Sequence, residues 1–343
     1  MIRALNNYMI ILLTGGTGYI GSHTAIAAMA AGHQVVLYDN LCNSHAEVIE
    51  KIHTITDQKI SFIQGDVLNT ELLYKTLVEY KVDAVIHLAG LKSVKDSSEY
   101  PINYYHNNVS GTISLLQAMS RAQVKKLVFS SSATVYGEPK YLPYDEHHPT
   151  KPINVYGRTK LQIEEVLRDV VDSDPTWRIL ALRYFNPVGA HPSGLIGENP
   201  QGIPNNLMPY VAKVAANELP ILHIFGDDYA TKDGTGERDY IHVMDLAEGH
   251  TAAIDYLKNY EGFRCINLGT GTAYSVLDLV KSFEEVLGRK VPYQISPRRP
   301  GDLPKYFADA SIAHKLLNWQ AHRSLLDMCH STWLFKKNSQ KGS

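Results

Sequence analysis

Residues 10–21 read Ile10-Ile11-Leu12-Leu13-Thr14-Gly15-Gly16-Thr17-Gly18-Tyr19-Ile20-Gly21. The apolar run ends in a glycine cluster, and an alanine-rich helical pattern follows, so the stretch predicts a strand, a tight turn and a helix. Gly16, Gly18 and Gly21 fit the spacing G-x-G-x-x-G, and Gly15 with the last two fits G-x-x-G-x-x-G. The missing side chains let the backbone approach a pyrophosphate, and the helix N-terminus offers it free N–H groups. The stretch therefore predicts a dinucleotide-binding turn.

An acidic residue follows this turn at the distance that a dinucleotide site requires. The apolar run Val35-Val36-Leu37-Tyr38 ends in Asp39, 18 positions after Gly21. A carboxylate at the end of the second strand accepts a hydrogen bond from a ribose 2′-hydroxyl and repels a 2′-phosphate. We therefore expect the cofactor to be NAD rather than NADP.

Composition and charge are those of an ordinary globular protein. Of the 343 residues, 44% are hydrophobic and 20% are charged, and the formal net charge of −2 gives no electrostatic reason to expect binding to nucleic acid or to an anionic membrane. The histidines show no metal-ligand spacing, so we expect no metal.

The start of the chain shows no signal-peptide pattern, and its apolar run is too short to span a bilayer. The chain has three widely separated cysteines, Cys42, Cys265 and Cys329. This pattern suits a reducing compartment, and we expect the protein to lie in the cytoplasm.

Strand and helix patterns alternate through the first half of the chain, which predicts an α/β fold with a Rossmann-like, doubly wound parallel sheet. Further strands are expected at 59–63, 83–88, 124–129 and 177–183, and helices at 70–80, 104–121 and 155–173. Residues 187–237 are rich in Pro, Gly and Asn, with a short helix expected at 208–217. We therefore expect 1–186 to form the NAD-binding domain, with 239–260 returning to it. Residues 187–343, including a helix at 276–287, are expected to form a smaller, mixed α/β substrate-binding domain.

Tyr156 and Lys160 lie four residues apart, and therefore on one face of the expected helix 155–173. A free tyrosine titrates near ~10 and is a poor base at neutral pH. A nearby ammonium group, together with the positive nicotinamide ring of NAD⁺, would lower the pKa of the phenol. Ser132, at the end of an expected strand, could hydrogen-bond to the hydroxyl oxygen from which Tyr156 would remove a proton. The three residues predict proton transfer to and from a hydroxyl group.

Several long stretches resemble the extended short-chain dehydrogenase/reductase family, and within it the UDP-glucose 4-epimerases. They are spread over the chain between about residues 10 and 320: 13–24, 39–44, 89–92, 130–137, 183–194, 200–210, 236–246 and 298–302. The resemblance implies a reversible interconversion of UDP-glucose and UDP-galactose. Tyr156 would take the proton of the C4 hydroxyl while the hydride on C4 passes to tightly bound NAD⁺. The resulting 4-keto sugar would then be reduced on its other face. It also implies a homodimer that pairs the helices at 104–121 and 155–173.

The resemblance further assigns residues to each ligand. NAD would contact residues from the glycine turn to the catalytic helix: Gly15, Gly18, Tyr19, Ile20, Gly21, Asp39, Asn40, Asp66, Val67, Lys92, Asn107, Tyr156, Lys160 and Phe185. The UDP-sugar would contact Ser132, Tyr156, Asn186, Asn206, Leu207, Phe225, Arg238, Arg299, Asp302 and Tyr306. Taken singly, some of these residues also fit plainer roles. Asn206 could cap a helix, Phe225 could be core, and Arg238 could pair with a neighbouring acid.

Three other functions remain open. A related enzyme could act on another nucleotide sugar, including the N-acetylated ones, although in the family a bulky residue such as Tyr306 accompanies restriction to UDP-glucose and UDP-galactose. A net dehydrogenase would exchange its cofactor freely, and a NAD-sensing regulator would lack chemistry. A 4,6-dehydratase is disfavoured, because Ala133 and Thr134 stand where it needs an acid and a base.

Overall fold

The structure is a computed structural model that describes residues 8–200, 204–299 and 301–341. Residues 201–203 and Pro300, in two of the stretches that carry the resemblance, lie outside the described residues. A seven-stranded, fully parallel sheet confirms the expected doubly wound fold. Its spatial order is β11 (Gly262–Leu268), β6 (Arg178–Tyr184), β5 (Lys126–Ser132), β4 (Ala84–His87), β1 (Ile10–Thr14), β2 (Gln34–Asp39) and β3 (Ser61–Gln64).

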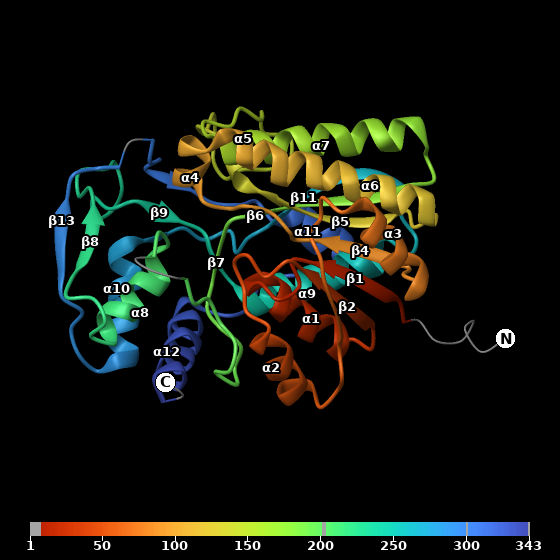
Figure 1. Ribbon diagram of the computed structural model, residues 1–343. Helices are drawn as coiled ribbons and strands as arrows, with labels where there is room; N and C mark the ends of the chain where they lie inside the picture. The colour runs from red at the N-terminus through yellow and green to blue at the C-terminus, as the bar shows by residue number, and fades with distance from the viewer. Residues whose placement is uncertain (1–7, 201–203, 300, 342–343) are drawn as a thin grey trace.

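Helices cover both faces of this sheet, as Figure 1 shows. One face carries α1 (Tyr19–Ala30), α2 (Glu47–Thr56), α9 (Val243–Tyr256) and α11 (Ser311–Leu317), and the other α3 (Thr70–Glu79), α6 (Gly111–Ala122) and α7 (Val155–Ser173). Along β1, Ile11 and Leu13 pack in the cluster with α1, whereas Ile10 and Leu12 pack in the cluster with α6. Because successive side chains of a strand point to opposite faces, burial on both faces requires the uninterrupted apolar run seen in the sequence.

The connection from β4 to α6 contains three short elements. These are α4 (Val94–Glu99), α5 (Pro101–Tyr104) and the π-helical turn η1 (Tyr105–Ser110). The sequence predicts one regular helix over 104–121, but the six residues of η1 have the wider π-helical winding. Single π-helical turns occur often at functional sites, because they turn side chains away from the regular helical register.

A smaller unit lies beside the sheet, at the left of Figure 1. Its strands form three small sheets: β7 (Asn186–Val188) with β10 (Tyr240–His242), β8 (Leu222–Phe225) with β13 (Tyr293–Ser296), and β9 (Glu237–Arg238) between β12 (Tyr274–Ser275) and β14 (Lys305–Tyr306). The helices α8 (Leu207–Ala215), α10 (Val276–Leu287) and α12 (Leu325–Lys341) enclose a separate apolar cluster around Leu279, Phe283 and Met328. The 3₁₀ turn η2 (Ala133–Val135) follows β5.

The chain crosses between the two units more often than we expected. Residues 262–268 and 311–317 were expected in the smaller domain, but β11 is the edge strand of the large sheet and α11 packs against α9. Every residue of β11 pairs with β6, which lies about 80 positions earlier in the chain, and local sequence patterns carry no signal for so distant a pairing. The division into two domains near Asn186 stays a prediction. None of the helices in the described ranges combines the length and hydropathy needed to cross a membrane.

Candidate active site

The glycine turn between β1 and α1 is packed too tightly to accept side chains. A Cβ atom on Gly21 would lie 2.1 Å from the carbonyl oxygen of Gly15, and one on Gly15 would lie 2.7 Å from the amide nitrogen of Ala89. Gly15 also has a positive φ of 70°, which favours glycine. Gly18 is the N-cap residue of α1, so the cap supplies no side-chain oxygen to the first N–H groups of the helix. These N–H groups and the helix dipole fit a pyrophosphate.

Two carboxylates lie at the ends of β2 and β3, next to this turn. Asp39 is buried, and it accepts hydrogen bonds from the amide of Thr17 at 3.1 Å and from the amide of Leu41 at 2.8 Å. Asp66 accepts one from the side chain of Asn40 at 2.8 Å. The structure thus brings together three of the residues that the resemblance assigns to NAD: Asp39, Asn40 and Asp66.

Three of the residues assigned to the two ligands are apolar and lie in three different clusters. Ile20, on α1, is partly buried against the cluster on its face of the sheet, and Val67 is buried in the opposite cluster. Leu207 begins α8 and is partly buried against the core of the smaller unit. These three side chains can contribute shape and contact area to a site, but no hydrogen bonds.

Tyr156, Ser132 and Lys160 converge where β5 ends and α7 begins. The side chain of Asn154 caps α7 by accepting a hydrogen bond from the amide of Gly157 at 2.7 Å, which fixes the first turn of the helix. The side chain of Ser132 lies close enough to the Tyr156 phenol to favour its ionised form by hydrogen bonding. Lys160 donates from Nζ to the carbonyl oxygen of Ser130 at 2.6 Å, and this Nζ lies 5.8 Å from the centre of the Tyr156 ring.

The loop after β4 connects this cluster to the glycine turn. Ala89 contacts the backbone of Gly15, as described above, and a Cβ atom on the next residue, Gly90, would lie 3.7 Å from Nζ of Lys160. A dinucleotide bound at the turn therefore has a short path to the Tyr156 hydroxyl.

The pKa of Tyr156 differs from our expectation. Burial raises it to about 12, and the hydrogen bond with Ser132 only partly opposes this effect. We expected Lys160 to lower the pKa of the phenol, but the ammonium is hydrogen-bonded to a carbonyl group and is itself poorly solvated. Burial lowers the pKa of Lys160 to about 7, against the opposing charge of Glu164. In the protein alone, burial thus outweighs the attraction between the two groups.

A buried ion pair that the sequence analysis did not find lies one helical turn beyond Lys160. The guanidinium of Arg183 donates to both carboxylate oxygens of Glu164, at 2.9 and 2.6 Å, and the hydroxyl of Ser131 donates to the same carboxylate at 2.5 Å. Only 5% of the Arg183 side chain and 2% of the Glu164 side chain are exposed. The sequence signal was the four-residue spacing of Tyr156, Lys160 and Glu164, which places all three on one face of α7.

The π-helical turn η1 brings a second residue that we missed into the site. Asn108 is buried, accepts a hydrogen bond from the amide of Leu91 at 2.8 Å and donates to the carbonyl oxygen of the same residue at 3.0 Å. It also donates to the hydroxyl of Thr159 on α7, at 3.3 Å. Asn107, which the resemblance assigns to NAD, donates to the side-chain oxygen of Asn108 at 2.9 Å. Asn108 therefore holds the loop after β4 against α7.

The residues assigned to the UDP-sugar gather around β7, β9 and β14. The Tyr306 hydroxyl donates to the side-chain oxygen of Asn186 at 3.0 Å, and the guanidinium of Arg238 lies over the Tyr306 ring at 4.7 Å. Arg238 also forms an ion pair with Asp302 at 3.8 Å, whereas the acid just before it in the chain, Glu237, pairs with Lys305. The Phe185 ring lies 6.1 Å from that of Tyr306.

Arg299 and Asn206 complete this side of the site. The guanidinium of Arg299 lies 3.9 Å from the centre of the Phe225 ring, so that a cation and an aromatic face lie together. Asn206 is the N-cap residue of α8, as its alternative role required, but its side chain donates to Glu198 at 3.0 Å and does not cap the helix. Planar cations and aromatic faces suit a nucleoside diphosphate.

One other cluster in the described part of the chain has the spacing of metal ligands: Asp245, Glu248 and His322. The guanidinium of Arg323 pairs with both of its carboxylates, and its distance to Glu248 is 2.8 Å. The two acids are thus already matched by a cation, and the cluster ties α9 to the segment before α12.

The fold and the site together define an extended short-chain dehydrogenase/reductase: a doubly wound sheet, a glycine turn, and a Tyr-x-x-x-Lys helix beside a serine. Residues 12–332 match the family model described as GDP-mannose 4,6 dehydratase. The chain is 52% identical to the UDP-glucose 4-epimerase of Bacillus subtilis, over 97% of this chain and 98% of that protein, and 49% identical to the Drosophila melanogaster enzyme, over 97% of each. It belongs to the UDP-glucose 4-epimerase family.

Solved structures of this family have the same fold. The Stenotrophomonas maltophila UDP-glucose-4-epimerase, with bound NAD and formylated UDP-arabinopyranose, superposes with a TM-score of 0.96 at 48% identity, over 98% of this chain and all of that chain. The Bifidobacterium longum enzyme, in complex with NAD⁺ and UDP, gives a TM-score of 0.93 at 49% identity, over 97% of this chain and all of that chain.

Proposed function

We propose that this protein interconverts UDP-glucose and UDP-galactose by inverting C4 of the hexose, with NAD bound throughout the cycle. The observation that carries the proposal is that Ser132 and Lys160 lie beside the phenol of Tyr156, next to a turn that fits a pyrophosphate. Relatives crystallised with NAD and with UDP support the choice of ligands. When bound, NAD supplies a site that accepts a hydride and gives it back.

Tyr156 is the proposed acid and base. It removes the proton of the C4 hydroxyl during oxidation and returns a proton when the 4-keto sugar is reduced on its opposite face. With a pKa of about 12, the phenol of Tyr156 stays protonated at neutral pH in the protein alone, and in that form it cannot accept the proton. The positive charges of Lys160 and of the nicotinamide ring would both favour the phenolate, so we propose that Tyr156 becomes an effective base only when the cofactor is seated. Ser132 orients the reacting oxygen.

The nucleotide and the sugar have different requirements in such a reaction. Arg238 and Arg299 would hold the diphosphate, and Phe225, Asn206 and Leu207 would hold the nucleoside, so that the UDP moiety stays fixed. Asn186 and Tyr306 would contact the hexose, which must present both of its faces in turn. Firm binding of UDP with loose binding of the sugar allows the 4-keto group to rotate without leaving the site.

A coupled assay of UDP-galactose conversion tests this function. The purified protein should contain NAD and should produce UDP-glucose without added nicotinamide cofactor. Tyr156→Phe should abolish turnover and keep the bound NAD, whereas Tyr141→Phe, which removes an exposed hydroxyl bonded to Asp145, should remain active. Stoichiometric consumption of cofactor would contradict the epimerase reaction, and unchanged turnover of Tyr156→Phe would contradict the proton-transfer role.

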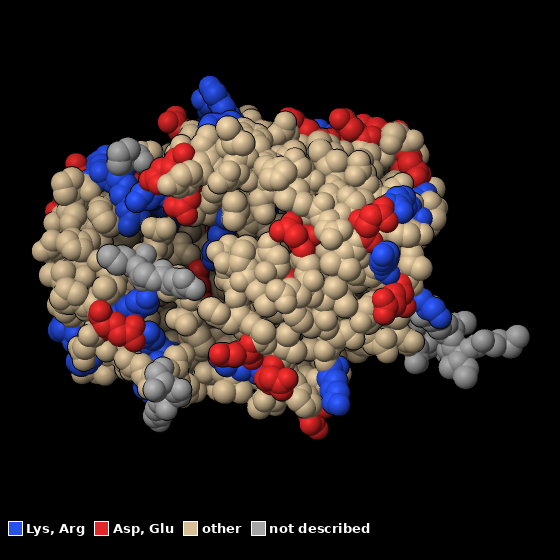
Figure 2. Space-filling model, in the orientation of Figure 1, with Lys and Arg blue, Asp and Glu red and all other residues tan. Residues whose placement is uncertain are grey.

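We also propose a homodimer formed through α6 and α7. Large apolar side chains on the segment before and within α6 are exposed, including Ile102 at 81% and Ile113 at 40%, and Figure 2 shows a largely uncharged surface in this region. Burial of such a patch favours association. Light scattering should give the mass of a dimer, and Ile102→Glu with Ile113→Glu should give a monomer.

A cytoplasmic location is proposed in addition, and the three free cysteines support it.

A further inference from the structure

Glu198 lies between the two proposed ligand sites and is bonded to a residue of each. Its Oε1 accepts a hydrogen bond from Nζ of Lys92 at 3.0 Å and another from Nδ2 of Asn206 at 3.0 Å. Lys92 follows β4 of the large sheet, whereas Asn206 begins α8 of the smaller unit. One carboxylate oxygen therefore joins a residue assigned to the cofactor with a residue assigned to the nucleotide sugar.

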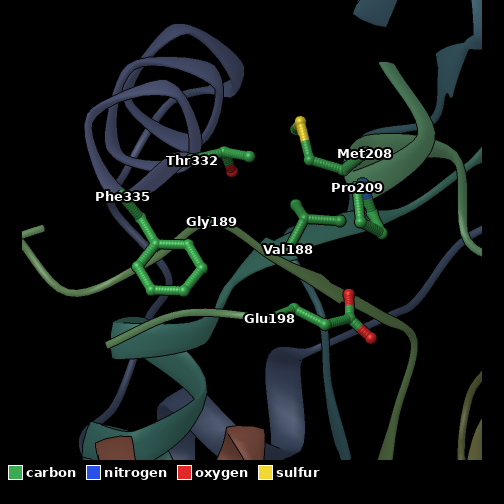
Figure 3. Close-up of a pocket in the computed structure, with 7 residues that line it drawn as sticks. All are labelled: Val188, Gly189, Glu198, Met208, Pro209, Thr332 and Phe335. Atoms are coloured by element: carbon green, nitrogen blue, oxygen red, sulfur yellow. The ribbon is translucent and has the colours of Figure 1, made fainter. Parts of the chain in front are cut away.

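The carboxylate is held firmly in this position. Only 11% of the Glu198 side chain is exposed, compared with 64% of that of Lys92. Figure 3 shows Glu198 at the edge of a small cavity, with its carboxylate turned away from the ring of Phe335. The cavity, of about 10 Å³, has room for about one water molecule and is lined mainly by apolar groups: Val188, Gly189, Glu198, Met208, Pro209, Thr332 and Phe335. A carboxylate against such a wall depends on its hydrogen bonds and its cation for stability.

The loop that carries Glu198 is also fixed to the helix behind the glycine turn. The hydroxyl of Tyr19 donates to the carbonyl oxygen of Gly189 at 2.7 Å, and Nζ of Lys92 lies 6.0 Å from the centre of the Tyr19 ring. Tyr19 stands directly after Gly18, at the first position of α1. A movement of the glycine turn would therefore reach Glu198 by two routes, through Tyr19 and through Lys92.

We propose that Glu198 is a positioning residue that couples the two sites, so that bound NAD strengthens the binding of UDP and bound UDP slows the loss of NAD. This inference rests on the proposed function. A ligand on either side orders the partner of Glu198 on that side, Lys92 or Asn206, and through the shared carboxylate the second ligand then has less disorder to remove. Coupling of this kind is reciprocal, because both ligands act on the same equilibrium.

The test measures binding in the NAD-loaded protein and does not depend on turnover. The rate of NAD release is followed with and without UDP, and the affinity for UDP is measured by calorimetry. In the wild type UDP should slow the release. In Glu198→Ala, UDP affinity should fall about tenfold, the factor expected for loss of a hydrogen bond to a charged group, and UDP should no longer slow the release. Glu198→Gln, which keeps an acceptor but not the charge, should be intermediate.

Matched variants separate coupling from simple stabilisation of the loop. Glu261→Gln removes one partner of an ion pair with Arg178 at the start of β6, away from the carboxyl ends of the strands, and should leave both binding readouts unchanged. If Glu198→Ala does not fold, Lys92→Met tests the same link, because it should weaken the binding of UDP although Lys92 is assigned to the cofactor side. UDP affinity and NAD release within twofold of wild type, with only a lower melting temperature, would overturn the inference. Coupled binding in a wild-type protein that fails to convert UDP-galactose would overturn the proposed function alone.

Discussion

Replacement of Arg183 by leucine should destabilise the protein by about 3–5 kcal/mol, the range for removing one partner of a buried ion pair. Both side chains of the pair are at least 95% buried, and Arg183 supplies two charge-assisted hydrogen bonds to Glu164. Without them, the carboxylate keeps only the hydroxyl of Ser131 and a weak donor, the thiol of Cys265 at 3.5 Å. At roughly 2–4 °C per kcal/mol, the expected fall in melting temperature is on the order of 10 °C.

The assay is thermal unfolding followed by circular dichroism, with two comparison proteins. Arg183→Leu combined with Glu164→Leu should recover most of the lost stability, because an apolar pair of similar size replaces the ion pair without leaving a charge unmatched. Arg121→Leu, which breaks the exposed pair with Glu71, should lower the melting temperature much less, because solvent screens an exposed pair. The reasoning is refuted if Arg183→Leu behaves like Arg121→Leu, or if the double variant is as unstable as the single one.

Two further predictions concern specificity and pH. Tyr306→Ser removes the ring over which Arg238 lies, and should add activity on UDP-N-acetylglucosamine in the coupled assay; strong wild-type activity on that substrate would contradict the assigned role of Tyr306. Stability should fall as the pH drops from about 6.5 towards 4, because burial lowers the pKa of four histidines and only the unfolded chain takes up their protons, at about 1.4 kcal/mol per histidine and pH unit. These are His23, His87 and His242, with pKa values of about 3, and His250, with a value of about 4. Melting temperatures between about pH 7 and pH 5 test this, and equal values at both ends would contradict it; His250→Leu should flatten the dependence.

Local patterns were sufficient for much of the fold. The glycine turn between β1 and α1 follows from residues that are adjacent in the chain, because strand burial, φ preference and helix periodicity are all local properties. The catalytic helix was expected at 155–173 and runs from Val155 to Ser173, capped by Asn154. The alternation of strands and helices then leaves few arrangements open other than a parallel sheet.

Long-range pairing decided what local patterns could not. β11 joins the large sheet through β6, and the carboxylate of Glu198 meets Lys92, 106 positions earlier in the chain. Neither contact has a periodicity or a spacing that a sequence displays. The assignment of residues to NAD and to the UDP-sugar stays a prediction, although the structure brings many of these residues together.

Because of burial, the pKa of Tyr156 differs from the expectation based on the sequence. The spacing of Tyr156 and Lys160 correctly places both on one face of α7, but it says nothing about the water around them. The enclosed site raises the pKa of the phenol and lowers that of the ammonium, since desolvation disfavours the charged form of each. The order of residues was therefore sufficient to propose the reacting groups. Their protonation depends on a dielectric environment that exists only once distant segments have closed around them.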